Sequence, residues 1–276
     1  MTNTTYEPLE NAPYVLFTVE DTGRQYRSST SVEPEPMGIG ITTTTGPEPE
    51  PGIIGWNLVL NGFEIADAVA RKYEVTVPGR DGTLDLSNAL GGVYYENRRI
   101  EMSFSCVNYI ADMFHVLASD MRNALDGKIV RAEFSHDTTF FWRGRAQVDA
   151  KWCGRWSKIS VTVDAEPFKY NVTSSYDPWL WDTFNFYSGI ITQASDIELT
   201  GETVSEVLPA DPARGKPTLW LNTGNAQARL STEKVWHTLK PGANMIPEIR
   251  LNPDGETTLL LNGTGSVGIE YRIGSL

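Results

Sequence analysis

The stretch "VPGRDGTLDLS" combines an arginine with two glycine turns, so it could either bind an anion or join two strands. A phosphate-binding loop also needs a Gly-Lys-Ser/Thr run before a helix, and none follows here. Pro78 and Gly79 can end one strand, while Asp81 and Gly82 can supply the positive φ that starts the next. Arg80 then lies at the tip, where it can pair with a carboxylate of the same or another chain. We predict a structural or intersubunit joint.

The glycine motif "GTGSVG" at 263–268 matches the G-x-G-x-x-G pattern of dinucleotide-binding proteins. That pattern binds a pyrophosphate only when a helix opens at the third glycine and an acidic residue follows about 20 residues later. The residues that follow here, "IEYRIGSL", alternate like a strand. We therefore expect no cofactor, and we interpret the glycines as a hairpin turn.

Nucleophilic catalysis requires a base beside the nucleophile, and the histidines are His115, His136 and His237. No G-x-S-x-G elbow accompanies them, and no spacing of His or Asp typical of a metal site is present. Glu133 and Asp137 have the residue types of a glycosidase pair, but their spacing alone does not establish one. We predict that the protein is not an enzyme and holds no metal, with an endolysin-like hydrolase as the alternative.

The chain has a formal net charge of -12, and its densest basic pair is Arg98–Arg99. Tight binding to DNA or RNA requires a basic surface, whereas DNA that passes nearby without sticking is compatible with this charge. Cys106 and Cys153 are far apart in sequence, so we expect two buried or half-buried thiols and no disulfide or zinc site. No apolar run has the length of a membrane span, and the N-terminus lacks signal-peptide features, which predicts synthesis and folding in a cytosol.

Residues 1–55 differ in composition from the rest of the chain. A strand-like run, "YVLFTVE", precedes two Glu-Pro blocks that flank "MGIGITTTT". Proline at alternate positions forbids a helix and holds the chain extended. Two interpretations stay open: a flexible linker, or an arm whose "IGITTTT" segment adds as a strand to a neighbouring molecule.

Residues 56–170 alternate between apolar and polar positions, which predicts antiparallel strands with one buried side. In "RKYEVTV", for example, Tyr73, Val75 and Val77 share one face. A hairpin is expected around "SHDT". The segment "EPFKYNVTSS" is typical of a domain boundary, because a proline is followed by polar residues and the residue pattern changes after it.

One helix is predicted over 107–126, and Gly127 follows it as a stop signal. His115 lies off its apolar stripe, which predicts a solvated surface histidine. We interpret the stripe as core packing. It comprises Val107, Ile110, Met113, Phe114, Leu117, Met121 and Leu125.

Residues 171–276 show short strand-like runs between turns, a spacing that indicates a β-sandwich. An aromatic cluster near the start of this range could stack on sugar rings, although packing inside the protein is the simpler interpretation. The cluster comprises Tyr176, Trp179, Trp181, Phe184, Phe186 and Tyr187.

Several segments together resemble the siphophage distal tail proteins. "VTVPGRDGTLDLSNALGGVYYENRRIEMSFSC" is similar to their N-terminal signature, a strand ending in Pro-Gly-Arg-Asp-Gly and then a Tyr … Arg-Arg-x-Ile strand that leads into a helix. "ALDGKIVRAEFSHDTTFFWRGRAQV" resembles their helix end and aromatic hairpin, and "AEPFKYNV" their domain boundary. "GTGSVGIEYRIGSL" is similar to the last strands of their galectin-like sandwich. The resemblance covers 55–170 and, loosely, 215–276.

The resemblance implies a mainly β fold in three parts: an N-terminal Pro/Glu-rich extension over 1–55, a ring-forming domain with one helix over 56–170, and a galectin-like β-sandwich over 171–276. Distal tail proteins form a ring, usually six-fold, at the tip of the phage tail. One face docks on the tail tube, the other holds the tail hub or lysin, and the lumen continues the DNA channel. Many phages attach receptor-binding proteins to the outward-pointing sandwiches.

For this chain the resemblance implies a structural virion protein that is made in the host cytoplasm, with no cofactor and no membrane partner. Candidate intersubunit residues are those of the turn, Pro78, Gly79, Arg80, Asp81 and Gly82, and the arginines Arg98 and Arg99 of the following strand. Two further alternatives remain: a carbohydrate-binding adsorption protein and a tail-tube protein.

Overall fold

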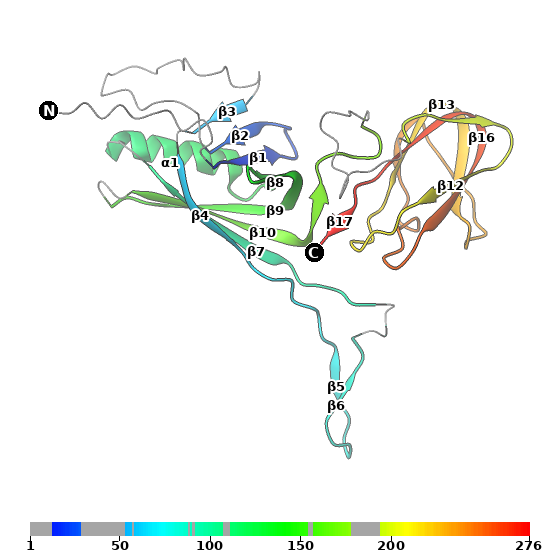
Figure 1. Ribbon diagram of the computed structural model, residues 1–276, viewed down its shortest axis with the longest axis horizontal. Helices are drawn as coiled ribbons and strands as arrows, with labels where there is room; N and C mark the ends of the chain where they lie inside the picture. The colour runs from blue at the N-terminus through cyan, green and yellow to red at the C-terminus, as the bar shows by residue number, and fades with distance from the viewer. Residues whose placement is uncertain are drawn as a thin grey trace. The chain divides into compact units, whose positions relative to one another are not determined.

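The structure is a computed structural model that describes residues 13–28, 53–56, 58–87, 89, 92–106, 111–153, 157–177 and 194–276. The chain divides into two compact units. Unit 1 runs to Thr138 and includes Trp142–Pro167, and unit 2 consists of Thr139–Phe141 and Phe168–Leu276. The described residues form many strands and one helix, so the predicted mainly β fold class is confirmed (Figure 1).

Unit 1 is built on a nine-stranded sheet in the order β3-β2-β1-β8-β9-β10-β7-β4; the ninth strand, β17, belongs to unit 2 and pairs with the end of β10 that also lies in unit 2. The β2–β3 pair is parallel. Apolar residues of β7 and β10 that face each other, such as Met102 and Val161, are almost completely buried. This alternation places one face of the sheet in the core, as the sequence pattern predicts. The strands are β1 (Val15–Val19), β2 (Gln25–Arg27), β3 (Ile53–Gly55), β4 (Val59–Ile65), β7 (Arg98–Ser105), β8 (Ile129–Phe134), β9 (Asp137–Lys151), β10 (Lys158–Asn171) and β17 (Gly274–Ser275).

Helix α1 (Ala111–Leu125) covers the buried face of this sheet (Figure 1). Phe114, Met121 and Leu125 join the sheet residues in one hydrophobic core. The helix stops where Gly127 adopts a φ of 74°, a left-handed conformation that glycine adopts at little cost. The structure confirms the predicted helix over 111–125, and residues 107–110 lie outside the described residues.

The first strands correct part of the prediction for residues 1–55. Val15, Phe17 and Val19 of β1 are buried in the unit 1 core, and β1 pairs with β8. The prediction of a linker or arm is therefore wrong for 13–28 and 53–55. The alternating run "YVLFTVE" is a strand of the sheet, and its apolar side chains belong to the core that the sheet shares with α1. The "IGITTTT" segment lies outside the described residues.

Four strands of unit 1 are cross-linked by an ionic network on the other face. The Arg143 guanidinium donates two hydrogen bonds of 2.8 Å to Glu20 and a further one to Glu166, while Arg131 donates to Glu20 at 3.1 Å. Burial raises the pKa of Glu20, but hydrogen bonds from Arg143 and Arg131 outweigh it and hold that pKa below its ordinary value. The charged form of Glu20 is thus favoured in the folded state.

Unit 2 folds around two long antiparallel strands, β13 and β16. Strand β13 pairs first with β15 and then with β14, and strand β16 pairs first with β12 and then with β11. These strands surround a separate apolar core. This arrangement agrees with the predicted sandwich. The strands are β11 (Ile197–Thr200), β12 (Val204–Leu208), β13 (Thr218–Leu230), β14 (His237–Thr238), β15 (Gly242–Met245) and β16 (Thr257–Glu270).

The motif "GTGSVG" lies inside strand β16, so its interpretation as a hairpin turn is wrong. Gly263 and Gly265 have positive φ values where β16 runs against Gly224 of β13. A side-chain carbon at Gly224 would lie only 1.9 Å from the carbonyl oxygen of Thr264. The glycines therefore allow the backbones of β13 and β16 to approach closely. In the sequence alone, glycines with this role look the same as glycines of a turn.

A buried carboxylate fixes the end of the chain in unit 2. Asp211 is fully buried and accepts hydrogen bonds from the amides of Ala213 at 3.1 Å, Gly215 at 2.7 Å and Gly274 at 2.8 Å. Three backbone donors on one carboxylate satisfy its charge without a cation. The loop after β12 is thereby held to strand β17.

We expect Asp211→Asn to destabilise unit 2 by about 2 kcal/mol, because an amide cannot accept from all three buried amides. Differential scanning calorimetry of the unit 2 transition measures the loss. Asp254→Asn, at an exposed aspartate of the same unit, is the matched control and should change little. Equal melting of the two variants would contradict this role for Asp211.

We expect Glu20→Gln to cost unit 1 about 1 kcal/mol at neutral pH, because its ion pairs are partly exposed. The folded-state pKa of Glu20 is lowered, so its contribution is complete above the unfolded pKa of about 4.3 and is lost as pH falls through the folded value. Urea unfolding between pH 3 and 7 should show a smaller loss of stability on acidification for Glu20→Gln than for the wild type. Glu101→Gln, at an exposed pair, is the control.

Candidate functional site

The candidate catalytic residues lie in separate places. His115 is exposed beside Phe114 and Trp152, His136 stacks on Phe63 at 4.8 Å, and His237 lies 3.8 Å from Glu233. Among the described residues, no group of three or more His, Cys, Asp or Glu could hold a metal ion. These positions bring together no nucleophile and base.

The cysteines and the candidate carboxylate pair have these positions. Cys106 is buried, which raises its pKa to about 11, whereas Cys153 is exposed and so departs from the expected burial. Glu133 is on β8 and Asp137 begins β9, on either side of the turn at Ser135–His136. Across the described part of the chain, no helix is long and apolar enough to cross a bilayer.

The most distinctive surface of unit 1 is the connection between β4 and β7, residues 66–97, which we call the hairpin extension. It contains the short ladder of β5 (Glu74–Thr76) and β6 (Thr83–Asp85), with Val75 opposite Leu84. Ala70 forms an isolated bridge with Tyr95 nearer the sheet. Figure 1 shows two segments of the chain leaving the sheet at β4 and β7 and coming together at this ladder.

The turn from Pro78 to Gly82 closes the hairpin extension. Gly79 and Gly82 have φ values of 80° and 77°, and the Arg80 amide donates to the Val77 carbonyl at 3.2 Å. Pro78 and Asp81 are exposed with them. Arg80 is also exposed, and the described residues of its own chain offer it no ion pair within salt-bridge distance. A pairing within the same chain is therefore not seen.

The ladder exposes apolar side chains that the sequence pattern predicts to be buried. Tyr73, Val75 and Val77 are exposed to 47%, 47% and 37%. The described residues of the hairpin extension contribute nothing to the unit 1 core. A two-stranded ladder has no second layer to cover its apolar face, so the predicted burial is wrong for the single chain. The same connection also exposes Val69, Leu86, Val93 and Tyr94.

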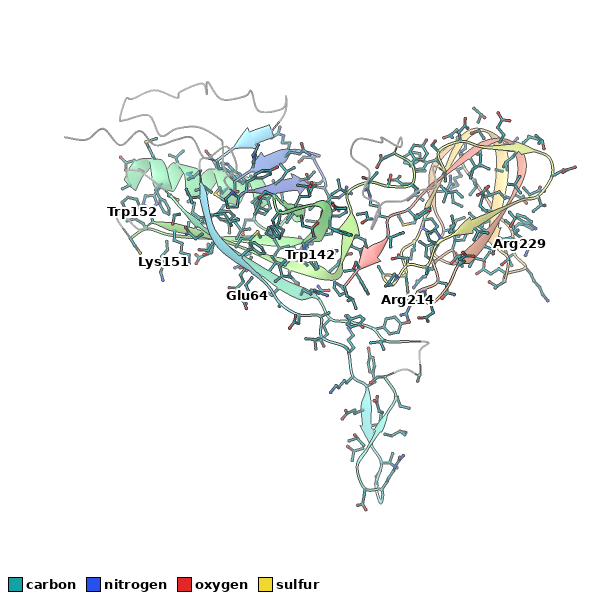
Figure 2. All side chains as sticks on the ribbon, viewed as in Figure 1. Glu64, Trp142, Lys151, Trp152, Arg214 and Arg229 are labelled. Atoms are coloured by element: carbon teal, nitrogen blue, oxygen red, sulfur yellow. The ribbon has the colours of Figure 1, made fainter. Side chains whose placement is uncertain are left out.

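The base of the hairpin extension is fixed by Arg98, the first residue of β7. Arg98 is only 9% exposed, and its guanidinium lies 5.1 Å from the ring centre of Trp142. Trp142 is on β9 and is labelled in Figure 2. Burial lowers the pKa of Arg98, and the nearby Asp67 opposes that effect. Arg99, in contrast, is exposed and pairs with Glu101 at 2.6 Å. The two predicted arginines therefore have different environments.

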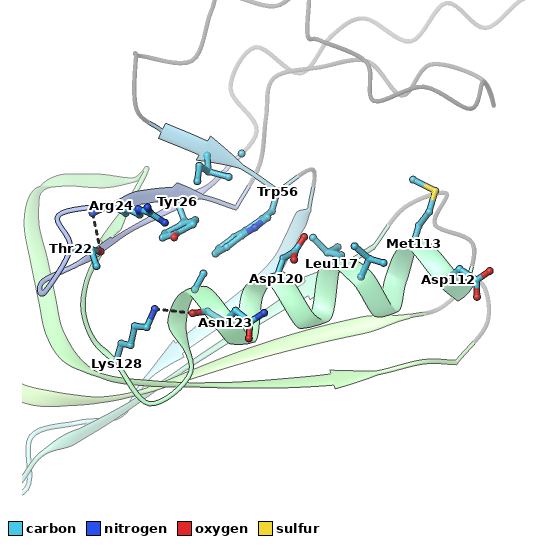
Figure 3. Close-up of a pocket in the computed structure, with 14 residues that line it drawn as sticks. Thr22, Arg24, Tyr26, Trp56, Asp112, Met113, Leu117, Asp120, Asn123 and Lys128 are labelled. Atoms are coloured by element: carbon cyan, nitrogen blue, oxygen red, sulfur yellow. Dashed lines mark hydrogen bonds between the residues drawn. The ribbon is translucent and has the colours of Figure 1, made fainter.

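A groove about 760 Å³ in volume lies between α1 and strands β2 and β3 (Figure 3). Its inner wall contains Tyr26 and Trp56, whose rings stack with centroids 4.9 Å apart, and Leu117. Its rim carries exposed apolar side chains from both walls. These are Ile54, Met113 and Val116, exposed to 48%, 56% and 61%.

Sequence reasoning missed this groove because it places Met113 in the buried stripe. Met113 is exposed instead, since the stripe is wider than the area that the sheet covers. The alternation of "YVLFTVE" signals that β1 joins the sheet, whereas β2 and β3, which build the other wall, are strands of three residues with no such signal.

We expect Arg98→Ala to loosen the base of the hairpin extension and to destabilise unit 1 by about 1 kcal/mol, through loss of the stacking on Trp142. Amide exchange should accelerate at Ala66, which donates to the Arg99 carbonyl at 3.0 Å. Arg99→Ala removes an exposed pair only and serves as the control. Unchanged exchange at Ala66 in Arg98→Ala would contradict the anchoring role.

Comparisons with known proteins give structural similarity without sequence similarity. No protein-family model matches the chain, and no curated protein matches it. The Dit protein of phage SPP1, described as a paradigm of the hub adsorption apparatus in phages infecting Gram-positive bacteria, is 13% identical with a TM-score of 0.46, over 79% of this chain and 94% of that one. A chain of the activated phage p2 baseplate is 10% identical with a TM-score of 0.40, over 96% and 98% of the two chains. The chain is thus similar to components of phage adsorption hubs and baseplates.

Proposed function

We propose that the protein is a distal tail protein of a siphophage, a structural virion component that forms a ring at the tip of the tail. The observation that carries the proposal is the hairpin extension, which exposes an apolar face that its own chain leaves uncovered. Exposed apolar patches of this kind mark surfaces for protein association. The segments that resemble distal tail proteins surround this extension, with Pro-Gly-Arg-Asp-Gly at its tip and Arg98–Arg99 at its base.

A ring would cover this surface if the ladder of one subunit lies against a different surface of its neighbour, which is a head-to-tail contact. Head-to-tail contacts produce closed rings when the rotation between neighbours closes. We propose six subunits on the resemblance alone.

In this role one face of the ring would join the tail tube and the other the hub or lysin, with receptor-binding or other baseplate proteins attached outside. DNA would pass through the lumen without specific binding, which agrees with a formal net charge of -12. The separated positions of the histidines and cysteines support a structural role over an enzymatic one.

Two alternatives receive less support. In the described part of unit 2, no aromatic side chain is among the exposed large apolar residues, although sugar stacking needs an exposed ring. Most of the aromatic cluster, from Trp179 to Tyr187, lies outside the described residues, and Tyr176 packs on Trp220 at 5.7 Å. A tail-tube protein would stack into long tubes, which the imaging below distinguishes from single rings.

We expect purified protein to form closed rings of one size, detected by negative-stain electron microscopy and by a single oligomer mass in native mass spectrometry. Arg80→Ala should shift the assembly midpoint about tenfold to higher concentration, because it removes a charged contact of about 1.4 kcal/mol. Arg250→Ala, at an exposed arginine of unit 2, is the control.

A monomer at every concentration in light scattering, with no rings in the images, would overturn the proposed function. Rings as stable in Arg80→Ala as in the wild type would leave Arg80 with a role in the turn only. Long tubes would favour the tail-tube alternative.

A further inference from the structure

The groove between β3 and α1 lies along one edge of the unit 1 sheet. Strand β3 is the last strand on that side, and β2 is its ladder partner among the described strands. An edge strand beside a helix can accept an extended peptide, which adds to the sheet through backbone hydrogen bonds and points alternate side chains into the groove. We infer that the groove binds an extended segment of a different protein, basic at its start and acidic at its end, as a strand antiparallel to β3. The inference stands apart from the proposed ring, because the bound segment does not come from another copy of this chain.

The backbone of β3 points toward the position of the added strand. The Trp56 amide donates to the Arg27 carbonyl at 2.9 Å. Successive residues of a strand direct their N–H groups to opposite edges, so the Gly55 amide points away from β2. Gly55 is exposed and lines the groove, and a glycine at such a position lets a second backbone approach closely. The groove therefore presents a hydrogen-bond donor where an added strand would carry its acceptors.

The groove is apolar where alternate side chains of the added strand would point. Met113 and Val116 of its rim are exposed to 56% and 61%, and the stacked rings of Tyr26 and Trp56 lie below them in the inner wall. Covering an exposed valine contributes about 1.5 kcal/mol or more. Apolar residues at every second position of the bound segment would cover this rim while its other side chains stay in solvent.

The size of the groove fits a single extended segment. Helix α1 has 15 residues, which makes the wall about 22 Å long at about 1.5 Å per residue. With about 10 Å between packed layers, the opening covers about 220 Å². A stable interface between two folded proteins buries about 800 Å² on each partner. The groove alone is therefore too small to dock the folded surface of a second copy.

The charges of the groove determine the order of residues in the bound segment. Asp112 lies at one end, and Arg24 and Lys128 lie at the other, as Figure 3 shows. Arg24 directly precedes β2, and Gln25 pairs with Ile53, so β3 begins at the Arg24 end and runs toward Asp112. A strand antiparallel to β3 then begins near Asp112 and ends near Arg24. Lysine or arginine at its start and aspartate or glutamate at its end place opposite charges together.

The residues that connect β2 to β3 have a different order of charges. Their sequence carries a Glu-Pro block on each side of "MGIGITTTT", so acidic residues stand at both ends of the apolar run. In the antiparallel direction the first block would face the carboxylates of Asp112 and Asp120. Like charges brought together in this way oppose binding. The charges therefore favour a segment of a different protein over this part of the same chain.

A pair of synthetic peptides tests the inference on the full chain. The first has about nine residues, which extend over about 30 Å at about 3.3 Å per residue: two lysines, alternating valine and threonine, and two glutamates. The second has the same residues in reverse order, and so the same composition with the opposite polarity. We expect fluorescence anisotropy to give at least tenfold tighter binding of the first peptide. Its binding should slow hydrogen exchange of the Gly55 amide at least fivefold and leave the Arg80 amide, in the exposed turn, unchanged.

Variants of the groove separate its apolar rim from its charges. Val116→Ser should weaken binding of the first peptide at least fivefold, whereas Ser119→Ala, at an exposed α1 residue outside the groove, is the control. Arg24→Glu combined with Asp112→Lys and Asp120→Lys reverses the charges of the groove, so it should transfer the preference to the reversed peptide. Circular dichroism checks that these variants, all at exposed positions, keep the fold of the wild type.

Each other result would overturn the inference. Equal binding of the two peptides, or binding without protection of Gly55, would show that no strand of defined direction adds to β3. Binding that appears only after residues 37–45 are replaced by an equally long Gly/Ser linker would assign the groove to the chain's own segment. Loss of the bound peptide as the protein associates would assign the groove to a second copy. Images of rings bear on the proposed function alone, so the two can fail independently.

Discussion

The structure depends on one constraint: apolar side chains on a two-stranded ladder have no second layer to cover them. Val75 and Val77 have the alternation of a half-buried strand, yet they remain exposed because β5 and β6 form a sheet of their own. Burying an exposed valine contributes about 1.5 kcal/mol or more, so several such residues favour association. We propose that another protein surface supplies that burial.

Unit 1 holds this ladder on a well-packed base. The sheet and α1 share one core, and the Glu20–Arg143 network joins the strands on the other face. Arg98 lies on Trp142 where the extension leaves the sheet. The extension is therefore positioned by buried groups while its own side chains stay open, as expected of a contact surface on a rigid support.

The sequence predicted elements better than it predicted surfaces. Local periodicity predicts the helix and the alternating strands. The turn from Pro78 to Gly82 follows from its proline and glycine residues. Periodicity identifies an apolar face without saying what covers it, so Tyr73 and Met113 were placed in a core and are exposed. Likewise, the glycines of "GTGSVG" satisfy a turn signal, yet they serve a close approach of β13 and β16 that only the pairing of distant strands creates.

The most direct measurement of the central claim is amide hydrogen exchange of residues 71–87 as a function of protein concentration. Association through the hairpin extension predicts that these amides become protected above the concentration at which the oligomer forms, while amides of unit 2 such as those of β12 exchange at a constant rate. Equal exchange of residues 71–87 in monomer and oligomer would contradict the claim that this apolar face is covered by another chain.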